Sequence, residues 1–579
     1  MLIRDFFKKY WWRYLLGIIF LITVDIIQIY IPRQVGQIVD MLEVPVNTVS
    51  EIRLLAIGII LFAGGLALGR FFWRICIVGA ARLFEFKTIN KMYKHIINLD
   101  QNFYDRWRTG DLMTRFTSDT QMLMRLMGFA VIMLVDAIFM TAITVYAMGS
   151  YVNWKLTFYA ILPLPTIAFM SLFFGRIIHK RFREVQESVS ELSNVTEESL
   201  SGIDVTKVFS NQKTMLKLFN KKSKLFYNAN IRLIRIWGLM FPMVSFLGAL
   251  STLILFWVGG RMVIMSEITL GDFIMTNQYI GMLIWPMMAF GQLVNMLQTG
   301  RASHKRIINV LKQKPLSEEP EQKEEDINYD FKGNYKIKNL TYHYPSNERI
   351  VLREVSLDIE QGQMLAFVGK VGSGKSTVAK LLAKLYPVEK ENIFLDGKEI
   401  NEWNGRFIRE NVSYVPQDNF LFSMTIRENI AFSNKDLHDE AENYAKMANV
   451  HEDIMNFPQK YETIVGQRGV TLSGGQRQRT TIARALAKRA NMIILDDCLS
   501  AVDTETEEAI IKNLREETKG KTILVISHRL KAVKEADQIF VFDDGQIVER
   551  GKHEELLIKQ GIYQSMYMKQ LIEEKLEEE

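Results

Sequence analysis

Six long apolar runs in the first 300 residues constrain the fold of this chain more than any other feature. A helical run of about 20 apolar residues matches the thickness of a lipid bilayer. Buried helices of a soluble protein are the alternative, but six such runs so close together favour a membrane domain. The first run is the least apolar, because it carries Asp25 and Gln28. The runs cover residues 14–31, 54–78, 127–149, 156–175, 238–264 and 273–297.

Basic residues are distributed unevenly over the connections between these runs. Segments 79–127 and 176–237 hold 8 and 12 Lys and Arg residues, whereas segments 32–53, 150–153 and 265–272 hold only Arg33 and Arg53. Because positive charge is retained on the cytoplasmic side, we expect both long connections and both chain ends in the cytoplasm. The net charge of +6 thus follows the inner leaflet and does not indicate a nucleic-acid partner. With only two cysteines, a disulfide framework is excluded.

The composition predicts two domains joined by a linker. We expect an all-α membrane domain over 1–311, whose two long connections extend the spanning helices into the cytosol. A glycine among polar residues interrupts each connection, at 103–119 and 201–212, and predicts a short crosswise helix at each tip. Residues 312–335 are charged and contain proline, which is typical of a linker. Residues 336–579 alternate polar and apolar segments, as an α/β domain does.

A phosphate-binding loop occupies residues 369–376 of the second domain. It follows an apolar strand predicted over 364–368 and precedes a helix predicted over 377–385, which begins with Thr377. Glycines allow backbone N–H groups to surround phosphates at the helix start. We expect the Lys375 ammonium to reach the β- and γ-phosphates of ATP and the Ser376 hydroxyl to bind Mg²⁺. The loop consists of Gly369, Lys370, Val371, Gly372, Ser373, Gly374, Lys375 and Ser376.

Two further segments carry phosphate chemistry. An apolar strand predicted over 492–496 delivers Asp496, whose carboxylate is suited to the Mg²⁺ water shell. A second loop precedes another helix, and a Ser-Gly-Gly stretch at a helix start also binds anions. The domain thus contains two loops of a kind that binds phosphate, and the presence of the second loop requires an explanation. This second loop consists of Leu472, Ser473, Gly474, Gly475 and Gln476.

The order of these motifs resembles the ATPase domain of ABC transporters, in which the loop 472–476 is the signature motif. Six spans, a linker and one nucleotide domain resemble a half-size type IV exporter over the whole chain. The resemblance implies that two nucleotide domains meet head to tail. Each ATP then lies between the P-loop of one chain and the signature of the other, which accounts for both loops. It also implies ATP and Mg²⁺ as cofactors and a multi-pass protein of a bacterial cell membrane.

Other positions take their expected roles from the same resemblance. Tyr344 resembles the aromatic residue that stacks on adenine, although a plain strand residue is the alternative. Gln417 resembles the glutamine that contacts Mg²⁺ and senses the membrane domain, and His528 resembles the switch histidine at the γ-phosphate. Segments 103–115 and 201–209 resemble the coupling helices. The D-loop between the two sites would consist of Ser500, Ala501, Val502 and Asp503.

Asp497 departs from the family pattern, which usually has Glu in the position of the general base. Losing one methylene withdraws the carboxylate by about 1–1.5 Å, and a misplacement of 1 Å can cost about 100-fold in rate. ATP binding through Lys375, Ser376 and Asp496 need not suffer. Gln467 is a second departure, because the family commonly has Glu there, and the change is expected to weaken coupling.

An intact signature beside a shortened base implies a division of labour between two different chains. This chain would lend its signature to a competent P-loop of a partner, while its own P-loop forms a degenerate site. Bacterial heterodimeric multidrug exporters have this arrangement, and residues 110–175 and 490–505 resemble their degenerate-site, BmrC-type subunit.

The sequence therefore predicts ATP-driven export of hydrophobic or amphipathic small molecules, with a second half-transporter as partner. A lipid or lipopeptide flippase is the alternative within transport. A homodimeric ATP-gated regulator is an alternative of another class, and it depends on Asp497 alone.

Three polar residues lie within the apolar spans and are expected to face a cavity or a partner helix. They are Asp25, Gln28 and Asp136. A polar face on the last span would line the translocation path or bond a neighbouring helix, and it consists of Gln292, Asn295 and Gln298.

Overall fold

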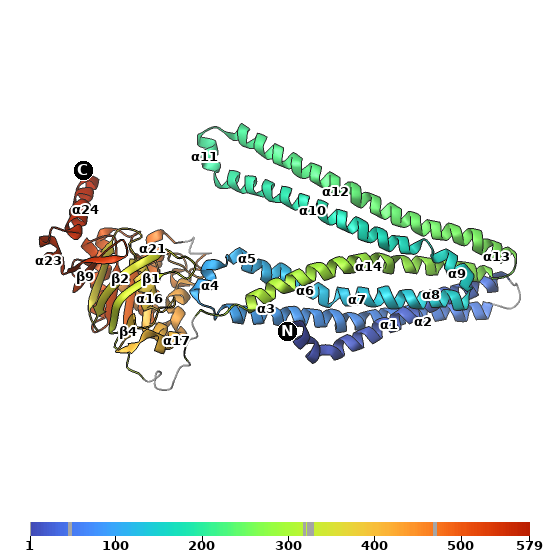
Figure 1. Ribbon diagram of the computed structural model, residues 1–579, viewed down its shortest axis with the longest axis horizontal. Helices are drawn as coiled ribbons and strands as arrows, with labels where there is room; N and C mark the ends of the chain where they lie inside the picture. Colours follow the sequence, from blue (N-terminus) through green and yellow to red (C-terminus); the bar gives the residue numbers. More distant parts are fainter. Residues whose placement is uncertain (1, 44–48, 317–319, 321–328, 467–471, 579) are drawn as a thin grey trace. The chain divides into compact units, whose positions relative to one another are not determined.

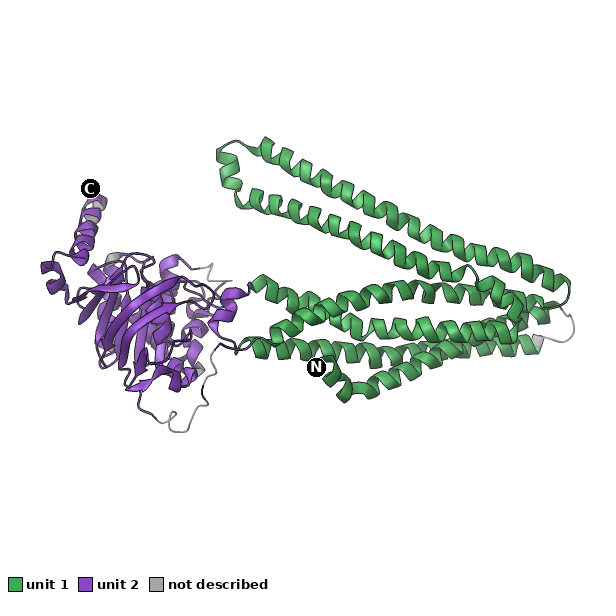
Figure 2. Ribbon diagram, viewed as in Figure 1, with its two compact units in different colours: residues 1–98, 109–313 green, residues 99–108, 314–579 purple. Residues whose placement is uncertain are grey.

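The computed structural model describes residues 2–43, 49–316, 320, 329–466 and 472–578. The chain forms two compact units (Figure 2). One contains residues 1–98 and 109–313, and the other contains residues 99–108 and 314–579.

The first unit is helical, and its described residues form six helical segments long and apolar enough to cross a membrane. Each contains one of the six predicted apolar runs, so that prediction is confirmed. The segments are 42 to 53 residues long. A helix of 42 residues measures about 63 Å, roughly twice the hydrocarbon thickness of a bilayer, so the segments continue well beyond it. They span Leu2–Glu43, Ser50–Ile96, Thr109–Tyr151, Trp154–Ser201, Gln212–Ile264 and Leu270–Leu311.

Several of these segments are divided by single turns of π-helix or by short breaks. The helices are α1 (Leu2–Glu43), α2 (Val49–Trp73), α3 (Gly79–Ile96), α5 (Thr109–Thr114), α6 (Thr120–Met127), α7 (Phe129–Val135), α8 (Thr141–Tyr151), α9 (Trp154–Ile161), α10 (Leu164–Ser201), α12 (Gln212–Ile254), α13 (Gly260–Ile264) and α14 (Leu270–Leu311). The π turns are η1 (Arg74–Val78), η2 (Arg115–Asp119), η3 (Asp136–Met140) and η4 (Leu255–Gly259).

Short helices occur at both positions where the long connections were predicted to break. Helix α11 (Ile203–Val208) joins the ends of α10 and α12, which lie side by side (Figure 1). Helix α4 (Gln101–Arg106) begins after Asp100, whose carboxylate caps it by accepting from the Phe103 N–H. The glycine signal marks the start of α11, which follows Gly202, whereas α4 begins two residues before the predicted segment and is set by the Asp100 cap, which was not predicted.

Helices α1 and α14 approach each other closely at a pair of glycines. A Cβ atom on Gly271 would lie 2.1 Å from the carbonyl oxygen of Gly36. The Gly271 N–H donates to Asp40 Oδ1 at 2.7 Å, and Tyr279 of α14 donates from its hydroxyl to the Ile29 carbonyl at 2.9 Å. Small residues and polar contacts of this kind hold helices together in lipid.

The second unit contains two sheets. The six-stranded sheet has the order β10-β9-β3-β8-β7-β6, with β10 antiparallel to its neighbour and the other strands parallel. The four-stranded antiparallel sheet has the order β2-β1-β4-β5. The strands are β1 (Tyr335–His343), β2 (Ile350–Ile359), β3 (Met364–Gly369), β4 (Ile393–Leu395), β5 (Lys398–Glu399), β6 (Val412–Val415), β7 (Met492–Asp496), β8 (Thr522–Ile526), β9 (Gln538–Asp543) and β10 (Gln546–Gly551).

Helices flank these sheets and complete an α/β domain, as predicted. Strands β3, β7 and β8 are buried at every residue, which explains why they read as continuous apolar runs. The helices are α16 (Lys375–Leu382), α17 (Gly405–Asn411), α18 (Ile426–Ile430), α19 (Ala441–Met447), α20 (His451–Met455), α21 (Gly474–Ala487), α22 (Thr504–Glu517), α23 (His553–Ile558) and α24 (Ile562–Glu578).

The parallel strands place the phosphate motifs at one edge of the sheet. Strand β7 coincides with the strand predicted over 492–496, and β3 includes the one predicted over 364–368. Helix α16 begins at Lys375, two residues before the predicted start, because the P-loop runs directly into its first turn. Ligands of open α/β sheets bind outside the carboxyl ends of such strands.

Candidate ATP-binding and hydrolysis site

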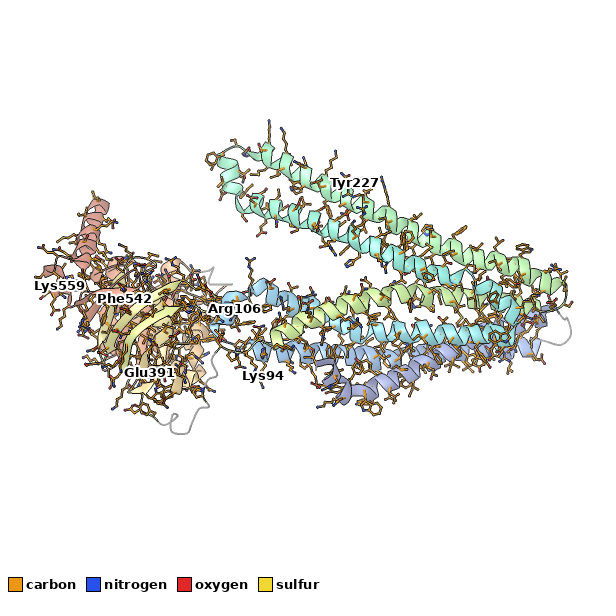
Figure 3. The ribbon with its side chains drawn as sticks, in the orientation of Figure 1. Lys94, Arg106, Tyr227, Glu391, Phe542 and Lys559 are labelled. Atoms are coloured by element: carbon orange, nitrogen blue, oxygen red, sulfur yellow. The ribbon has the colours of Figure 1, made fainter. Side chains whose placement is uncertain are left out.

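The P-loop has a backbone that only glycine adopts without strain. Gly369 and Gly374 have φ angles of +140° and +101°. A Cβ atom on Gly369 would lie 2.1 Å from the carbonyl oxygen of Phe542, a β9 residue labelled in Figure 3. Glycine is therefore required there both for backbone conformation and for the close approach of β3 and β9.

Lys375 is held inside this loop. Its ammonium donates to the carbonyl oxygens of Gly369 at 2.8 Å and Lys370 at 2.7 Å. The residue is only 5% exposed, and burial lowers the pKa of the ammonium to about 8, against the opposing charges of Asp497 and Asp496. The loop thus fixes a cation at the start of a helix, where the N-terminal dipole also favours anions.

Asp496 lies buried at the end of β7, beside the P-loop. Its Oδ1 accepts from the Ser376 hydroxyl at 2.7 Å, and its Oδ2 accepts from the Tyr414 hydroxyl at 2.8 Å. Tyr414 lies on β6, the neighbour of β7, and its pKa is raised by burial and by the Asp496 charge. Tyr414 was not predicted as a site residue, because only the pairing of β6 with β7 places it there.

These donors fit a magnesium ion. Mg²⁺ is usually held by one or two carboxylates together with substrate phosphates, and a hydroxyl completes the set in P-loop proteins. Asp496 and Ser376 are in direct contact and supply those oxygens. Among the described residues, no three His, Cys, Asp or Glu side chains gather into a self-contained metal site.

Asp497, Gln417 and His528 lie together next to this carboxylate. The Gln417 amide donates to Asp497 Oδ2 at 3.2 Å. Asp497 and His528 line one cavity of about 100 Å³. Burial raises the pKa of the Asp497 carboxyl, which the charge of His528 opposes, and burial lowers the pKa of the His528 imidazole. The structure therefore brings all three predicted catalytic side chains to one place.

The backbone of Asp497 is itself unusual. Its φ angle is +48°, in the left-handed region, and its N–H donates to the Ile526 carbonyl of β8 at 2.9 Å. Asp is among the few residues enriched in that conformation, because its short side chain bonds locally. The chain thus turns sharply after β7 and directs the Asp497 carboxylate toward the Gln417 amide.

Tyr344 contacts the first turn of the P-loop helix α16. Its hydroxyl lies 3.0 Å from Thr377 Oγ1, and its ring meets the Tyr386 ring edge to face at 5.0 Å between centroids. Tyr386 in turn donates to Asp105 Oδ2, on α4, at 2.8 Å. The predicted adenine-stacking residue is therefore two contacts away from a predicted coupling helix. Tyr386 was not identified from the sequence, since no local motif contains it.

The signature loop is an ordered helix start. Ser473 caps α21 through a reciprocal pair of bonds with Gln476, at 3.2 and 3.0 Å, which is a capping box. The Gln476 amide also donates to Asp453 Oδ1 at 3.0 Å. Among the described residues, no hydrogen bond or ion pair joins 472–476 to the P-loop. Gln467, the second departure from the family pattern, lies outside the described residues.

The predicted D-loop is fixed from two sides. Gln478 of α21 accepts from the Ala501 N–H at 2.9 Å and donates to the Ser500 hydroxyl at 3.3 Å. Arg529 donates to the Ser500 carbonyl at 3.2 Å and pairs with the buried Glu507 at 2.9 Å. Val502 is buried, and Asp503 caps α22 by accepting from the Thr506 N–H at 2.8 Å. Gln478, Arg529 and Glu507 were not predicted, because their contacts join segments distant in sequence.

Comparisons with known proteins match both domains. The ABC transporter transmembrane region matches residues 14–287, and the ABC transporter ATPase family matches residues 352–500. The chain is 38% identical to a probable multidrug resistance ABC transporter of Bacillus subtilis, YheI, over 98% of this chain and 96% of that protein. It is 33% identical to the multidrug resistance-like protein MdlA of Escherichia coli, over 99% and 97%.

Two further comparisons bear on fold and cargo. An ATP-dependent lipid A-core flippase of Haemophilus influenzae is 32% identical over 83% of this chain and 81% of its own length. The structure of a bacterial Atm1-family ABC exporter with ATP bound has the same fold, with a TM-score of 0.78 and 23% identity, covering 96% of this chain and 99% of that one.

The described residues thus combine six helical segments long and apolar enough to cross a membrane, a P-loop with its Asp496 carboxylate, and a signature loop at a helix start, in a chain whose two halves both match ABC transporter families. The chain belongs to the ABC transporter family and is a multi-pass membrane exporter with a cytoplasmic, ATP-hydrolysing domain.

Proposed function

We propose that this chain is one half of a heterodimeric exporter that moves hydrophobic or amphipathic small molecules across the cell membrane. Asp497 in the position of the general base, beside an intact signature loop, is the observation that carries the proposal. The multidrug resistance names of the Bacillus and Escherichia relatives support the class of cargo. The membrane domain would comprise 1–311, the linker 312–335 and the nucleotide domain 336–579.

In this proposal the chain binds ATP firmly at its own P-loop. Lys375 and the backbone N–H groups of the loop hold the β- and γ-phosphates, and the Tyr344 ring stacks on adenine. Ser376 and Asp496 hold Mg²⁺ together with Gln417, and the ion neutralises charge on the phosphates when it is bound. None of these groups depends on the length of the side chain at position 497, so binding is retained.

Hydrolysis at the same site is slow because the base is short. Asp497 is held at the start of a sharp turn by its N–H bond to Ile526, and its Oδ2 is already engaged by Gln417. The carboxylate therefore stops about 1–1.5 Å short of where a Glu would place it, which corresponds to a rate loss of about 100-fold. Asp497 remains the base of this site, and His528 and Gln417 remain its neighbours.

The signature loop then acts on the ATP of the partner. Gln476 and Ser473 are fixed by the capping box, and Gln478 and Arg529 fix the adjoining D-loop. A rigid helix start is what a second P-loop needs in order to close upon it with little ordering cost. ATP binding would close the two nucleotide domains, and hydrolysis at the partner's site would reset the transporter.

Helix α4 is the proposed route between the nucleotide and the membrane domain. The contact from Tyr344 through Tyr386 to Asp105 joins the expected adenine platform to this helix. Closure at the adenine would therefore be transmitted to the ends of the spanning helices that α4 connects.

Co-purification from the native membrane tests the assembly. Affinity capture of the full chain is expected to recover a second half-transporter with Glu after its own strand-terminal Asp. Recovery of a stable homodimer without drug-stimulated ATPase would overturn the proposal and favour an ATP-gated regulator.

Lipid translocation is the second candidate, and the similarity to lipid A-core flippases supports it. Reconstituted into vesicles with its partner, the exporter is expected to move apolar dyes and to leave fluorescent lipid analogues in place. ATP-dependent movement of lipid without movement of dyes would select the flippase function.

A further inference from the structure

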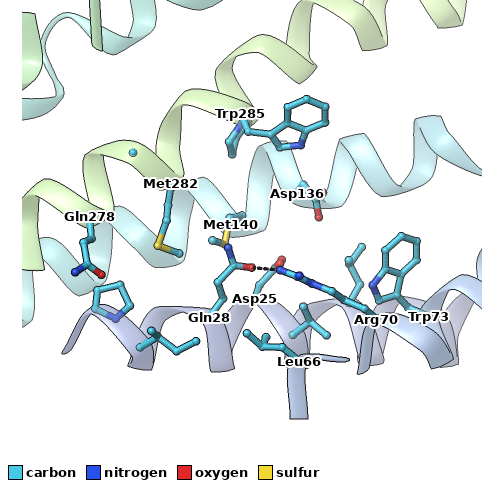
Figure 4. A pocket seen from close by; sticks show the side chains of 16 residues that line it. Asp25, Gln28, Leu66, Arg70, Trp73, Asp136, Met140, Gln278, Met282 and Trp285 are labelled. Atoms are coloured by element: carbon cyan, nitrogen blue, oxygen red, sulfur yellow. Dashed lines mark hydrogen bonds between the residues drawn. The ribbon is translucent and has the colours of Figure 1, made fainter. Parts of the chain in front are cut away.

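A cavity within the membrane domain carries polar groups that the nucleotide chemistry does not use. It measures about 740 Å³, within the usual range for small-molecule sites, and is lined by α1, α2, η3 and α14 (Figure 4). Its polar and aromatic lining includes Asp25, Gln28, Arg70, Trp73, Asp136 and Trp285. The three polar residues predicted within the first and third spans thus face one cavity rather than separate partner helices.

Asp25 is the central feature of this lining. The residue is 5% exposed, and its Oδ2 atom is buried without a hydrogen-bond partner in the part of the chain that the structure describes. Asp136 Oδ1, reaching the same cavity from η3, is likewise buried without a partner among the described residues. A polar atom left unpaired in lipid is costly, so such residues mark ligand or ion sites by default.

The charges around the cavity do not balance. Arg70 is the one cation among the described lining residues, and its guanidinium donates to Gln28 Oε1 at 3.4 Å (Figure 4). Among the described residues, the Arg70 guanidinium forms no ion pair within 4.0 Å with Asp25 or Asp136, and its hydrogen bond goes to Gln28. Two carboxylates against one guanidinium leave an excess of one negative charge when both acids are ionised.

The remaining lining residues suit a ligand that is largely apolar and carries one positive charge to balance the excess negative charge of the cavity. Trp73 and Trp285 present indole rings, whose faces attract organic cations. Met140 and Met282 add flexible thioethers that adapt to ligands of different shape. An inorganic ion would leave these apolar surfaces unused.

We propose that this cavity binds amphipathic organic cations of single positive charge, with the cationic centre beside Asp25 and Asp136 and the apolar body against the two indoles. The proposal rests on the proposed export function and narrows its cargo from apolar molecules in general to cations. Asp25 and Asp136 would attract the cationic centre of the ligand through their negative charge. Trp73 and Trp285 would contact the apolar body of the ligand.

Binding of a matched pair of probes to the purified full transporter tests this. Tetraphenylphosphonium is the cation, and triphenylphosphine oxide is a neutral molecule of related shape. Wild-type protein is expected to bind the cation at least tenfold more tightly. Asp25→Asn and Asp136→Asn are each expected to weaken cation binding about tenfold or more, the usual effect of losing a charged partner, and to change neutral binding less than about twofold.

The isosteric Asp→Asn changes remove buried, unpaired charge, so they are not expected to lower the thermal stability of the protein. Glu51→Asn, which removes an exposed acid at the start of α2, is the matched control and should leave both probes unaffected. Equal binding of the two probes, or unchanged cation binding in both Asp variants, would overturn the cation site and leave export of neutral molecules standing. Failure of wild-type protein to bind either probe would count against both proposals.

Discussion

Arg529→Met tests the anchoring of the D-loop. Arg529 pairs with Glu507 at 2.9 Å, and the Glu507 side chain is only 2% exposed whereas that of Arg529 is 38% exposed. Removing one partner of a buried pair usually costs about 3–5 kcal/mol, because the other charge stays buried and unpaired. Since Arg529 is partly solvated, we expect the lower end, about 3 kcal/mol, which corresponds to a fall in Tm of roughly 6–12 °C for a domain of this size.

The same variant has an expected pH dependence. Burial raises the pKa of Glu507 above its ordinary 4.5, and Arg529 opposes that rise. Without Arg529 the folded pKa rises further, so the folded state binds more protons than the unfolded state over a wider window above 4.5. Stability then falls as pH increases through that window. The loss in Arg529→Met is therefore expected to be larger at pH 8 than at pH 5.5.

Thermal unfolding of the purified full chain at both pH values measures these effects. The double variant Arg529→Met with Glu507→Gln is the control, and it should recover about 2 kcal/mol of the loss because no buried charge remains. A fall in Tm below about 2 °C for Arg529→Met, or an equal fall at both pH values, would refute the account of this pair.

Substitutions at three positions address the nucleotide site. Lys375→Ala should weaken labelling of this chain by an azido-ATP analogue about tenfold or more, because the buried ammonium is lost, while labelling of the partner persists. Tyr344→Phe should keep ATP affinity within about threefold because it loses only the Thr377 bond, whereas Tyr344→Ala should lose about tenfold with the stacking platform, as measured by ATP titration. With the partner's general base inactivated, Asp497→Glu should raise residual ATPase about tenfold or more, and an unchanged rate would contradict the argument from side-chain reach.

Local signals in the sequence identified much of the fold. Apolar length located all six spanning segments, because a bilayer fixes how many apolar residues a helix needs. Strand β7 was predicted to the residue, since a buried parallel strand is a continuous apolar run bounded by polar residues. The P-loop glycines at 369 and 374 were recognisable because backbone angles there exclude other residues.

Contacts between segments that are distant in the sequence could not be predicted from the sequence alone. Tyr414 bonds Asp496 only because β6 pairs with β7, and Tyr386 meets Asp105 only because the tertiary fold brings α4 to the segment that follows α16. Asp25 and Asp136 were recognised as polar residues in apolar spans, but their common cavity depends on how α1 packs against η3. Such pairings depend on the tertiary fold, which no spacing within one motif encodes.

ATPase activity of two variants of the assembled transporter tests the central claim most directly. Asp497→Asn is expected to retain more than half of the turnover, whereas changing the partner's general-base Glu to Gln is expected to remove nearly all of it. ATP binding to this chain should be preserved in both. If Asp497→Asn alone abolishes turnover, this chain's own site is the fast one, and the proposed division of labour is wrong.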